Sequence, residues 1–171
     1  MTILDKDGRA FVSITRAMMK RSVEETNDMK SPPSRLEAHR GASGAYPENT
    51  MLAFAKAREA GALAIETDLS LLADGGFAVF YDGALGSTVD GDASLDSLTS
   101  AETGTMTSGA WSGEEFANET VPLLEDLLHW QAGTGMRFNI EMKCRGARQG
   151  EAASALAAQL AGVQLLSLIH I

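Results

Sequence analysis

Short apolar runs alternate with helix-spaced apolar positions along most of the chain. The predicted strands are 36–40, 62–69, 77–82 and 136–143, and the predicted helices are 50–60, 122–131 and 150–161, with Asn49 as the N-cap of the first. A loop-rich connection over 83–120 separates the third strand from the second helix, and the apolar tail 163–171 predicts a fifth strand. This alternation is typical of β/α units on a parallel sheet, so the sequence predicts an α/β fold.

The first 34 residues follow a different pattern. Apolar spacing over 11–25 predicts an amphipathic helix, and the following Ser31-Pro32-Pro33-Ser34 cannot continue it because proline lacks the amide hydrogen that a helix interior needs. We therefore expect 1–34 to be a helical and linker appendage and 35–171 to be the β/α domain.

Length, charge and cysteine content exclude several classes of protein. The net charge of −9 disfavours nucleic-acid partners, and the single cysteine, Cys144, excludes an internal disulfide and lacks partners for a zinc module. No run approaches 18 apolar residues and the N-terminus is polar, so we expect no membrane insertion and a cytoplasmic location. The 171 residues suffice for one domain but are few for an eight-fold β/α barrel, which usually needs about 250.

Acidic side chains gather on one face of two predicted strands. Because strand side chains alternate between faces, Glu66 and Asp68 point the same way, and so do Asn139, Glu141 and Lys143 on the fourth strand. Like charges in a narrow space raise each other's pKa unless a cation compensates them. Carboxylate oxygens favour a hard divalent ion, so the sequence predicts an Mg²⁺ or Ca²⁺ site.

The other two predicted strands also end in polar groups, His39 and Arg40 after the first and Tyr81 and Asp82 after the third. The forked guanidinium of Arg40 suits a phosphate, and Lys143 offers a point charge for the same group. A metal ion, two cations and a histidine together indicate phosphoryl chemistry.

At these residues the sequence resembles the glycerophosphodiester phosphodiesterase family. The resemblance covers about 36–145 and is carried by an ordered set of motifs: Ala38-His39-Arg40-Gly41, Pro47-Glu48-Asn49-Thr50, Ala53-Phe54, Glu66-Thr67-Asp68, Asp74-Gly75, the Trp111 region, Val121-Pro122-Leu123 and Asn139-Ile140-Glu141-Met142-Lys143. It implies a (β/α)8 barrel of the TIM type, of which this chain would hold only the N-terminal four to five units. It also implies hydrolysis of small-molecule glycerophosphodiesters to glycerol 3-phosphate and an alcohol.

The resemblance also implies roles for individual residues. Glu66, Asp68 and Glu141 would be the metal ligands, Arg40 and Lys143 would contact the phosphate, and His39 would be one of two histidines that act as general acid and base. Glu48 and Asn49 would shape the loop beside them and complete the substrate-binding set.

Two departures from the family pattern affect the expected activity. Tyr81 occupies the catalytic position where the family has its second histidine, and Ser87 stands where an arginine is usual. Tyrosine, with an ordinary pKa of about 10, is a poor base, and losing one general catalyst typically costs about 10²- to 10⁴-fold, so we expect weak turnover. The absent barrel strands would expose sheet edges, which favours self-association.

Two alternatives remain at this stage. One is a non-catalytic relative or fragment that keeps the metal and phosphate site. The other is a related phosphodiesterase that acts on lysophospholipid head groups, although the Pro47-Glu48-Asn49-Thr50 stretch argues against it.

Overall fold

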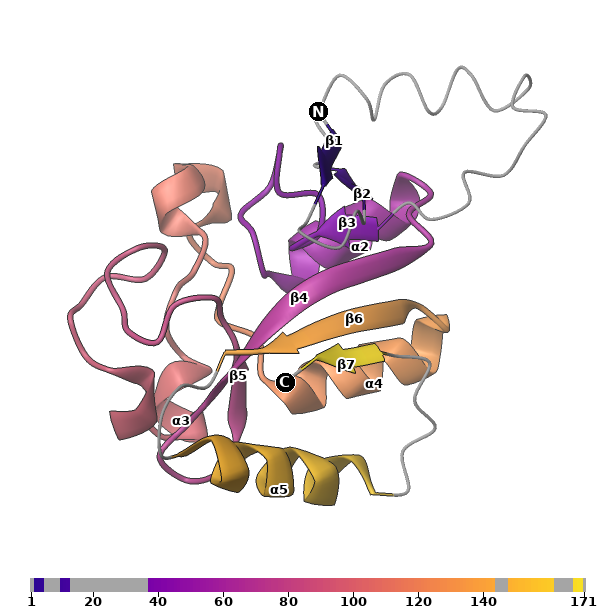
Figure 1. The fold of residues 1–171 in the computed structure, drawn as a ribbon. Coiled ribbons are helices and arrows are strands. Elements are labelled where there is room, and N and C mark those ends of the chain that lie inside the picture. Colours follow the sequence, from indigo (N-terminus) through magenta and orange to yellow (C-terminus); the bar gives the residue numbers. More distant parts are fainter. Residues whose placement is uncertain (1, 5–9, 13–36, 144–147, 162–167, 171) are drawn as a thin grey trace, which may run out of the picture.

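The fold is built on a mostly parallel β-sheet. The structure is a computed structural model, and it describes residues 2–4, 10–12, 37–143, 148–161 and 168–170. Its strands are β1 (Thr2–Leu4), β2 (Ala10–Val12), β3 (Glu37–His39), β4 (Ala64–Leu71), β6 (Arg137–Met142) and β7 (Leu168–His170), in the order β1-β2-β3-β4-β6-β7, with β5 (Phe77–Val79) paired to β4. All neighbours from β2 to β7 along this order run parallel. The predicted α/β class is confirmed, and Figure 1 shows β4 crossing the molecule with β6 beside it.

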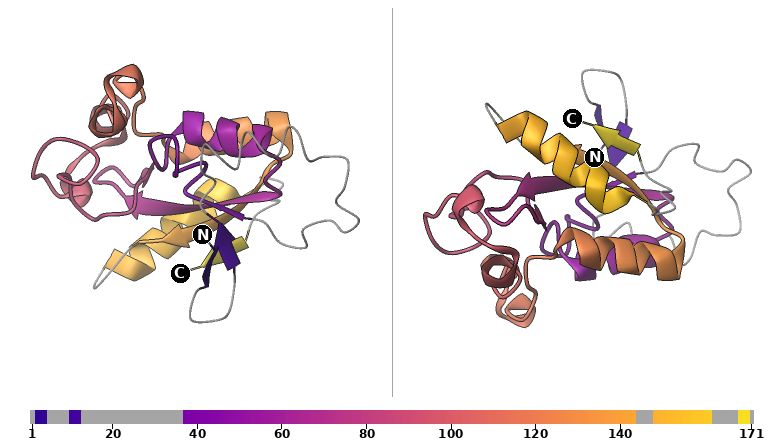
Figure 2. Two further views of the ribbon diagram at one scale, coloured as in Figure 1. Left: turned by 90° about the horizontal axis from the view of Figure 1, so that it is seen from above. Right: turned by 90° about the horizontal axis from the view of Figure 1, so that it is seen from below.

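Three helices pack on the sheet and build its main apolar core. They are α2 (Met51–Glu59), α4 (Leu124–Thr134) and α5 (Gln149–Leu160), and Figure 2 shows α2 and α4 on the same face of the sheet. The rings of Phe54 and Phe138 meet edge to face with centroids 5.7 Å apart, which joins α2 to β6. Within the described residues, no helix has both the length and the apolar character that crossing a membrane requires.

The first helix begins one residue later than the sequence predicts. Its N-cap is Thr50, whose Oγ1 accepts a hydrogen bond from the Ala53 amide (3.2 Å) and donates one to the Pro47 carbonyl (2.8 Å). Asn49, the predicted cap, instead has a left-handed backbone with φ of 54°. The cap was misplaced because asparagine suits both an N-cap and a left-handed turn.

The third predicted strand is present but runs antiparallel to β4, with Leu69 opposite Val79 and Leu71 opposite Phe77. The chain reverses at Asp74 and Gly75, where φ of Gly75 is +84° and Asp74 accepts a hydrogen bond from the Gly76 amide. Such a turn is too short for the crossover that a parallel neighbour needs, so β5 is the return arm of a hairpin and not a further β/α unit.

Near the N-terminus, Phe11 and Val12 lie in β2 and not at the start of a helix, so the sequence-based prediction is wrong for these two residues. The remainder of the predicted helix lies outside the described residues. The division into an appendage and a β/α domain stays a prediction.

The segment between β5 and α4 carries short elements and a small apolar cluster of its own. The elements are η1 (Leu95–Ser97), α3 (Ser100–Thr103), η2 (Ala110–Ser112) and η3 (Glu114–Phe116). The buried members of the cluster are Leu72, Ala78, Phe80, Val89, Leu95 and Val121. In Figure 1 this segment lies at the carboxyl end of β4.

We expect Gly41→Ala to lower the free energy of unfolding by more than about 2 kcal/mol. Gly41 has φ of +82°, and a Cβ there would lie 2.7 Å from the carbonyl carbon of Ala53, so the change adds a backbone clash to about 1–2 kcal/mol of left-handed strain. The control is Gly61→Ala, where φ is +85° but no atom lies within 4 Å of the new Cβ. Equal losses in urea unfolding of the two variants would contradict this account.

Candidate active site

Backbone hydrogen bonds to β4 bring three separate segments to one place. Three amides donate to carbonyls of this strand: Arg40 to Glu66 (2.8 Å), Phe80 to Asp68 (3.0 Å) and Lys143 to Leu69 (2.7 Å). Because the three acceptors lie close together in the middle of β4, the side chains beside the donor amides meet there. All nine site residues that the sequence predicted lie in this region.

Three carboxylates form a cluster beside the carboxyl ends of β3 and β6. Glu66, Asp68 and Glu141 each offer an oxygen, and these oxygens lie within 4.8 Å of one another. The parallel register of β4 and β6 puts Asp68 opposite Glu141, as side-chain alternation predicted. Glu66 and Asp68 are buried, whereas Glu141 is exposed to solvent.

These carboxylates fit a divalent cation. Oε2 of Glu66 is buried and has no hydrogen-bond partner among the described residues, although it lies 3.7 Å from Nε2 of His39. A buried anionic oxygen without a hydrogen bond is costly unless a cation neutralises it, and hard oxygen donors are the ligands that Mg²⁺ and Ca²⁺ take. The trio can therefore hold such an ion.

Burial has a strong effect on the titration of Glu66. Burial and, after it, the nearby negative charge of Asp68 raise the pKa of this carboxyl from its ordinary 4.5 to about 8, whereas the positive charge of Arg40 opposes the shift. In the metal-free protein Glu66 therefore carries a proton over much of the neutral range.

Two cations sit against the carboxylates. The Arg40 guanidinium donates from Nη1 to Oε1 of Glu48 (2.8 Å), and its Nε lies 3.1 Å from Oδ2 of Asp68, an ion-pair distance without hydrogen-bond alignment. Nζ of Lys143 lies 2.7 Å from Oε1 of Glu141 and 3.4 Å from Oδ1 of Asp68. Burial alone would lower the pKa of both basic groups, but the neighbouring carboxylates raise it, so both are firmly charged.

His39 stands at the edge of the cluster, where β3 ends. Burial lowers the pKa of its imidazole below 6.5, and the positive charge of Arg40 lowers it further. A neutral imidazole is available near pH 7, so His39 can accept a proton there.

Tyr81 lies two residues after β5, the second strand of the β4–β5 hairpin, and its ring extends into the site. Its ring centroid lies 3.8 Å from Cζ of Arg40 and 4.6 Å from Nζ of Lys143, and the side chain remains 43% exposed. Tyr81 thus meets the two predicted phosphate contacts even though its strand runs opposite to the predicted direction.

Asn49 links the loop after β3 to Asp68. Its Nδ2 donates to Oδ2 of Asp68 (3.2 Å), its Oδ1 accepts from Oγ1 of Thr67 (2.8 Å), and its backbone amide donates to the Arg40 carbonyl (3.1 Å). These contacts join the loop at Asn49 to β4, and the predicted place of Asn49 in a substrate-binding set stays a prediction. The sequence analysis missed Thr67, although a hydroxyl on an otherwise apolar face is a signal that some group must pair with it.

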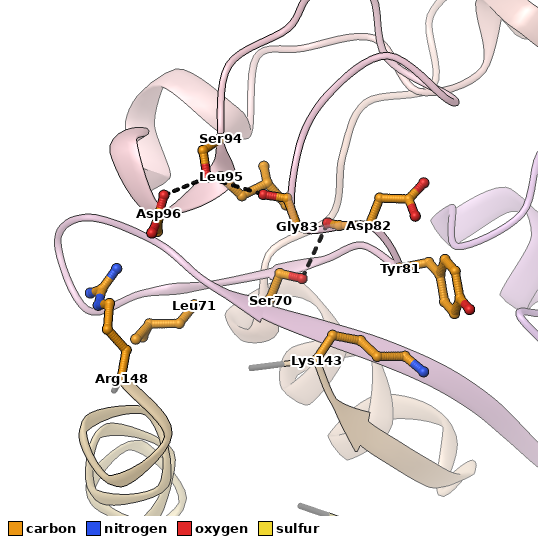
Figure 3. Close-up of a pocket in the computed structure, with 10 residues that line it drawn as sticks. All are labelled: Ser70, Leu71, Tyr81, Asp82, Gly83, Ser94, Leu95, Asp96, Lys143 and Arg148. Atoms are coloured by element: carbon orange, nitrogen blue, oxygen red, sulfur yellow. Dashed lines mark hydrogen bonds between the residues drawn. The ribbon is translucent and has the colours of Figure 1, made fainter. Parts of the chain in front are cut away.

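A hollow of about 510 Å³ opens beside Tyr81 and Lys143. Figure 3 shows the Lys143 side chain pointing toward Tyr81 at one end of the hollow. Arg148 and Asp96 lie at the other end. Sequence reasoning missed Asp96 and Arg148, because neither follows a strand of the sheet and no local motif marks them.

One protein-family model matches most of this chain. The family model for the "Glycerophosphoryl diester phosphodiesterase family" matches residues 39–164, which include every predicted site residue.

Curated relatives share part of the sequence. The "Uncharacterized protein YqiK" of Bacillus subtilis is 41% identical over 110 residues, covering 64% of this chain and 45% of the relative. A "Glycerophosphodiester phosphodiesterase" of Caldanaerobacter subterraneus is 37% identical over 106 residues, covering 62% and 44%. The chain thus spans about half the length of these relatives.

Solved structures share the fold. A phosphodiesterase of Oleispira antarctica, solved in complex with the product sn-glycerol-3-phosphate, superposes with a TM-score of 0.73 at 32% identity, covering 79% of this chain and 56% of the other. A glycerophosphodiester phosphodiesterase of Agrobacterium tumefaciens gives a TM-score of 0.68 at 30% identity, covering 80% and 57%. This likeness supports the predicted β/α-barrel type, and the prediction that this barrel is incomplete stays a prediction.

Glu66 should make the metal-free protein less stable as the pH rises. A carboxyl whose folded pKa is raised binds its proton more tightly in the folded state, so its favourable contribution is full below about 4.5 and is lost as the pH rises through about 8. The expected loss reaches about 1.4 kcal/mol per pH unit within that window.

The measurement is urea unfolding from pH 5 to 9 in the presence of a chelator. Subtracting the stability curve of Glu66→Gln from that of the wild type removes the contributions of the other titrating groups, including His39. Parallel curves for the two proteins would show that Glu66 titrates normally.

Proposed function

Because this chain belongs to the glycerophosphoryl diester phosphodiesterase family, we propose that it hydrolyses glycerophosphodiesters to glycerol 3-phosphate and an alcohol. The observation that carries the proposal is the meeting of three carboxylates, two cations and His39 around the middle of β4. The sn-glycerol-3-phosphate bound as product in the Oleispira antarctica phosphodiesterase supports the substrate class.

Each group has a role in this reaction. Glu66, Asp68 and Glu141 would hold a divalent ion, Mg²⁺ or Ca²⁺, and that ion would supply positive charge that polarises the phosphate and makes the attacking oxygen more acidic. Arg40 and Lys143 bind the phosphate oxygens and offset their charge.

His39 takes the proton of the attacking oxygen, which comes from water or from the substrate's own glycerol hydroxyl. The bond from phosphorus to the departing alcohol oxygen then breaks, and that oxygen needs a proton. Where the glycerol hydroxyl attacks, loss of the alcohol leaves a cyclic glycerol phosphate, and a water molecule then opens this ring to give glycerol 3-phosphate. In this chain Tyr81 occupies the position of the second family histidine, so protonation of the departing oxygen is the step that we expect to be slow.

The hollow beside Tyr81 and Lys143 suits the alcohol portion of the substrate. It lies next to Lys143, one of the two cations proposed to contact the phosphate, and charged, polar and apolar residues line it. A diester whose phosphate contacts Lys143 can place one of its two substituents there.

A second candidate function is a non-catalytic relative that binds metal and phosphate without turnover. The observation that favours it is the exposed Tyr81 in the position of a general catalyst. The following experiment separates the two.

We expect release of glycerol 3-phosphate from glycerophosphocholine only when Mg²⁺ or Ca²⁺ is present, measured with a coupled enzyme assay. Glu66→Ala should reduce the rate at least 100-fold because it removes a ligand of the ion. The matched control is Glu125→Ala, an exposed glutamate on α4 that should leave the rate within twofold. Metal binding by calorimetry without release would favour the non-catalytic relative, and absence of metal binding would overturn both proposals.

Tyr81→His should raise kcat at least tenfold, because an imidazolium is a stronger acid than a phenol and can protonate the departing oxygen near pH 7. Steady-state kinetics with saturating metal measures this. An unchanged kcat would mean that position 81 takes no part in proton transfer.

A further inference from the structure

Tyr81 contacts two cations at once. Its ring lies 3.8 Å from Cζ of Arg40 and 4.6 Å from Nζ of Lys143. Both distances are within the range of about 6 Å over which the negative face of an aromatic ring attracts a cation. The ring is therefore a contact that the Arg40 and Lys143 side chains share.

Asp68 is the other contact that these cations share. Its Oδ2 faces Nε of Arg40 and its Oδ1 faces Nζ of Lys143. Two positive groups this close repel each other, and their long side chains lose rotamer entropy when they are held in one arrangement. The carboxylate and the ring together offset that repulsion.

The backbone around Tyr81 fixes where the ring lies. The preceding Phe80 amide donates to the Asp68 carbonyl (3.0 Å), and the buried Ser70 hydroxyl donates to the Phe80 carbonyl (3.1 Å). Among the residues that the structure describes, the Tyr81 hydroxyl makes no hydrogen bond. The contacts that Tyr81 makes with the cations thus come from its ring.

We infer that Tyr81 is a positioning residue whose ring keeps Arg40 and Lys143 together as a phosphate-binding pair, and that its hydroxyl is not needed for this. The inference rests on the proposed function only in taking a phosphate group as the ligand of the pair. It assigns Tyr81 a contribution to substrate affinity, separate from the proton transfer that the position serves in the family.

The ring becomes more important when a divalent ion is bound. Asp68 is one of the three carboxylates that can hold the ion, and a carboxylate that shares its charge with an ion attracts Arg40 and Lys143 less. The ring carries no net charge and is not a ligand of the ion, so its attraction for the two cations persists.

The test compares Tyr81→Phe, which keeps the ring, with Tyr81→Leu, which removes it. Glycerol 3-phosphate is titrated by calorimetry into each variant with and without Mg²⁺. Tyr81→Leu should weaken binding about tenfold, as expected for the loss of two partly exposed cation–π contacts, whereas Tyr81→Phe should stay within about twofold of the wild type. In kinetics, the loss in Tyr81→Leu should appear mainly in KM.

A double-mutant cycle shows whether the ring acts through the cations. Tyr81→Leu and Lys143→Met together should weaken binding by less than the product of their separate effects. The ring-current shifts of the Arg40 and Lys143 side-chain methylene protons, measured by NMR, should persist in Tyr81→Phe and disappear in Tyr81→Leu. Trp111→Leu, which removes a similarly exposed aromatic ring elsewhere, should leave both readouts unchanged.

Three results would overturn the inference. They are an equal loss of binding in Tyr81→Phe and Tyr81→Leu, independent effects in the cycle, or a wild-type chain that does not bind glycerol 3-phosphate. Normal phosphate binding and NMR shifts without turnover of any diester would instead refute the hydrolytic function and leave the role of the ring intact.

Discussion

Backbone hydrogen bonding to one fully buried strand is the constraint on which the site depends. Every residue of β4 is buried, so each of its polar backbone groups must find a partner within the protein. In the middle of the strand these partners are amides from three distant segments, at Arg40, Phe80 and Lys143. The site is assembled because this strand must satisfy its carbonyls, and the charged side chains are placed as a consequence.

Burying several charges in one place is costly, and the structure offsets the cost by pairing. Asp68, which is almost inaccessible to solvent, faces both Arg40 and Lys143 and accepts a hydrogen bond from Asn49. Removal of one partner from such a set leaves a buried charge without compensation. Glu66 is the least compensated member, which explains both its raised pKa and its fitness as a ligand for a cation.

Most of the fold and the site could be predicted because both follow from strand periodicity. The alternation that places Glu66 and Asp68 on one face is a property of any strand, and parallel register then brings Glu141 beside them. The direction of β5 was missed, although the short Asp74-Gly75-Gly76 turn already excluded a crossover. The cation contacts of Tyr81, the Thr67–Asn49 hydrogen bond and the position of Arg148 depend on tertiary packing between remote segments, which a single sequence does not display.

The separate apolar cluster beneath the loop-rich segment has a consequence for how such a protein can diversify. Leu95 and Val121 pack with Phe80 in that cluster and take no part in the core between the sheet and its helices. The segment that forms one wall of the hollow thus has its own internal packing. Its loops can be lengthened, shortened or exchanged between homologues while the candidate site residues on β4 and β6 keep their positions, so selection can change ligand preference without changing those residues.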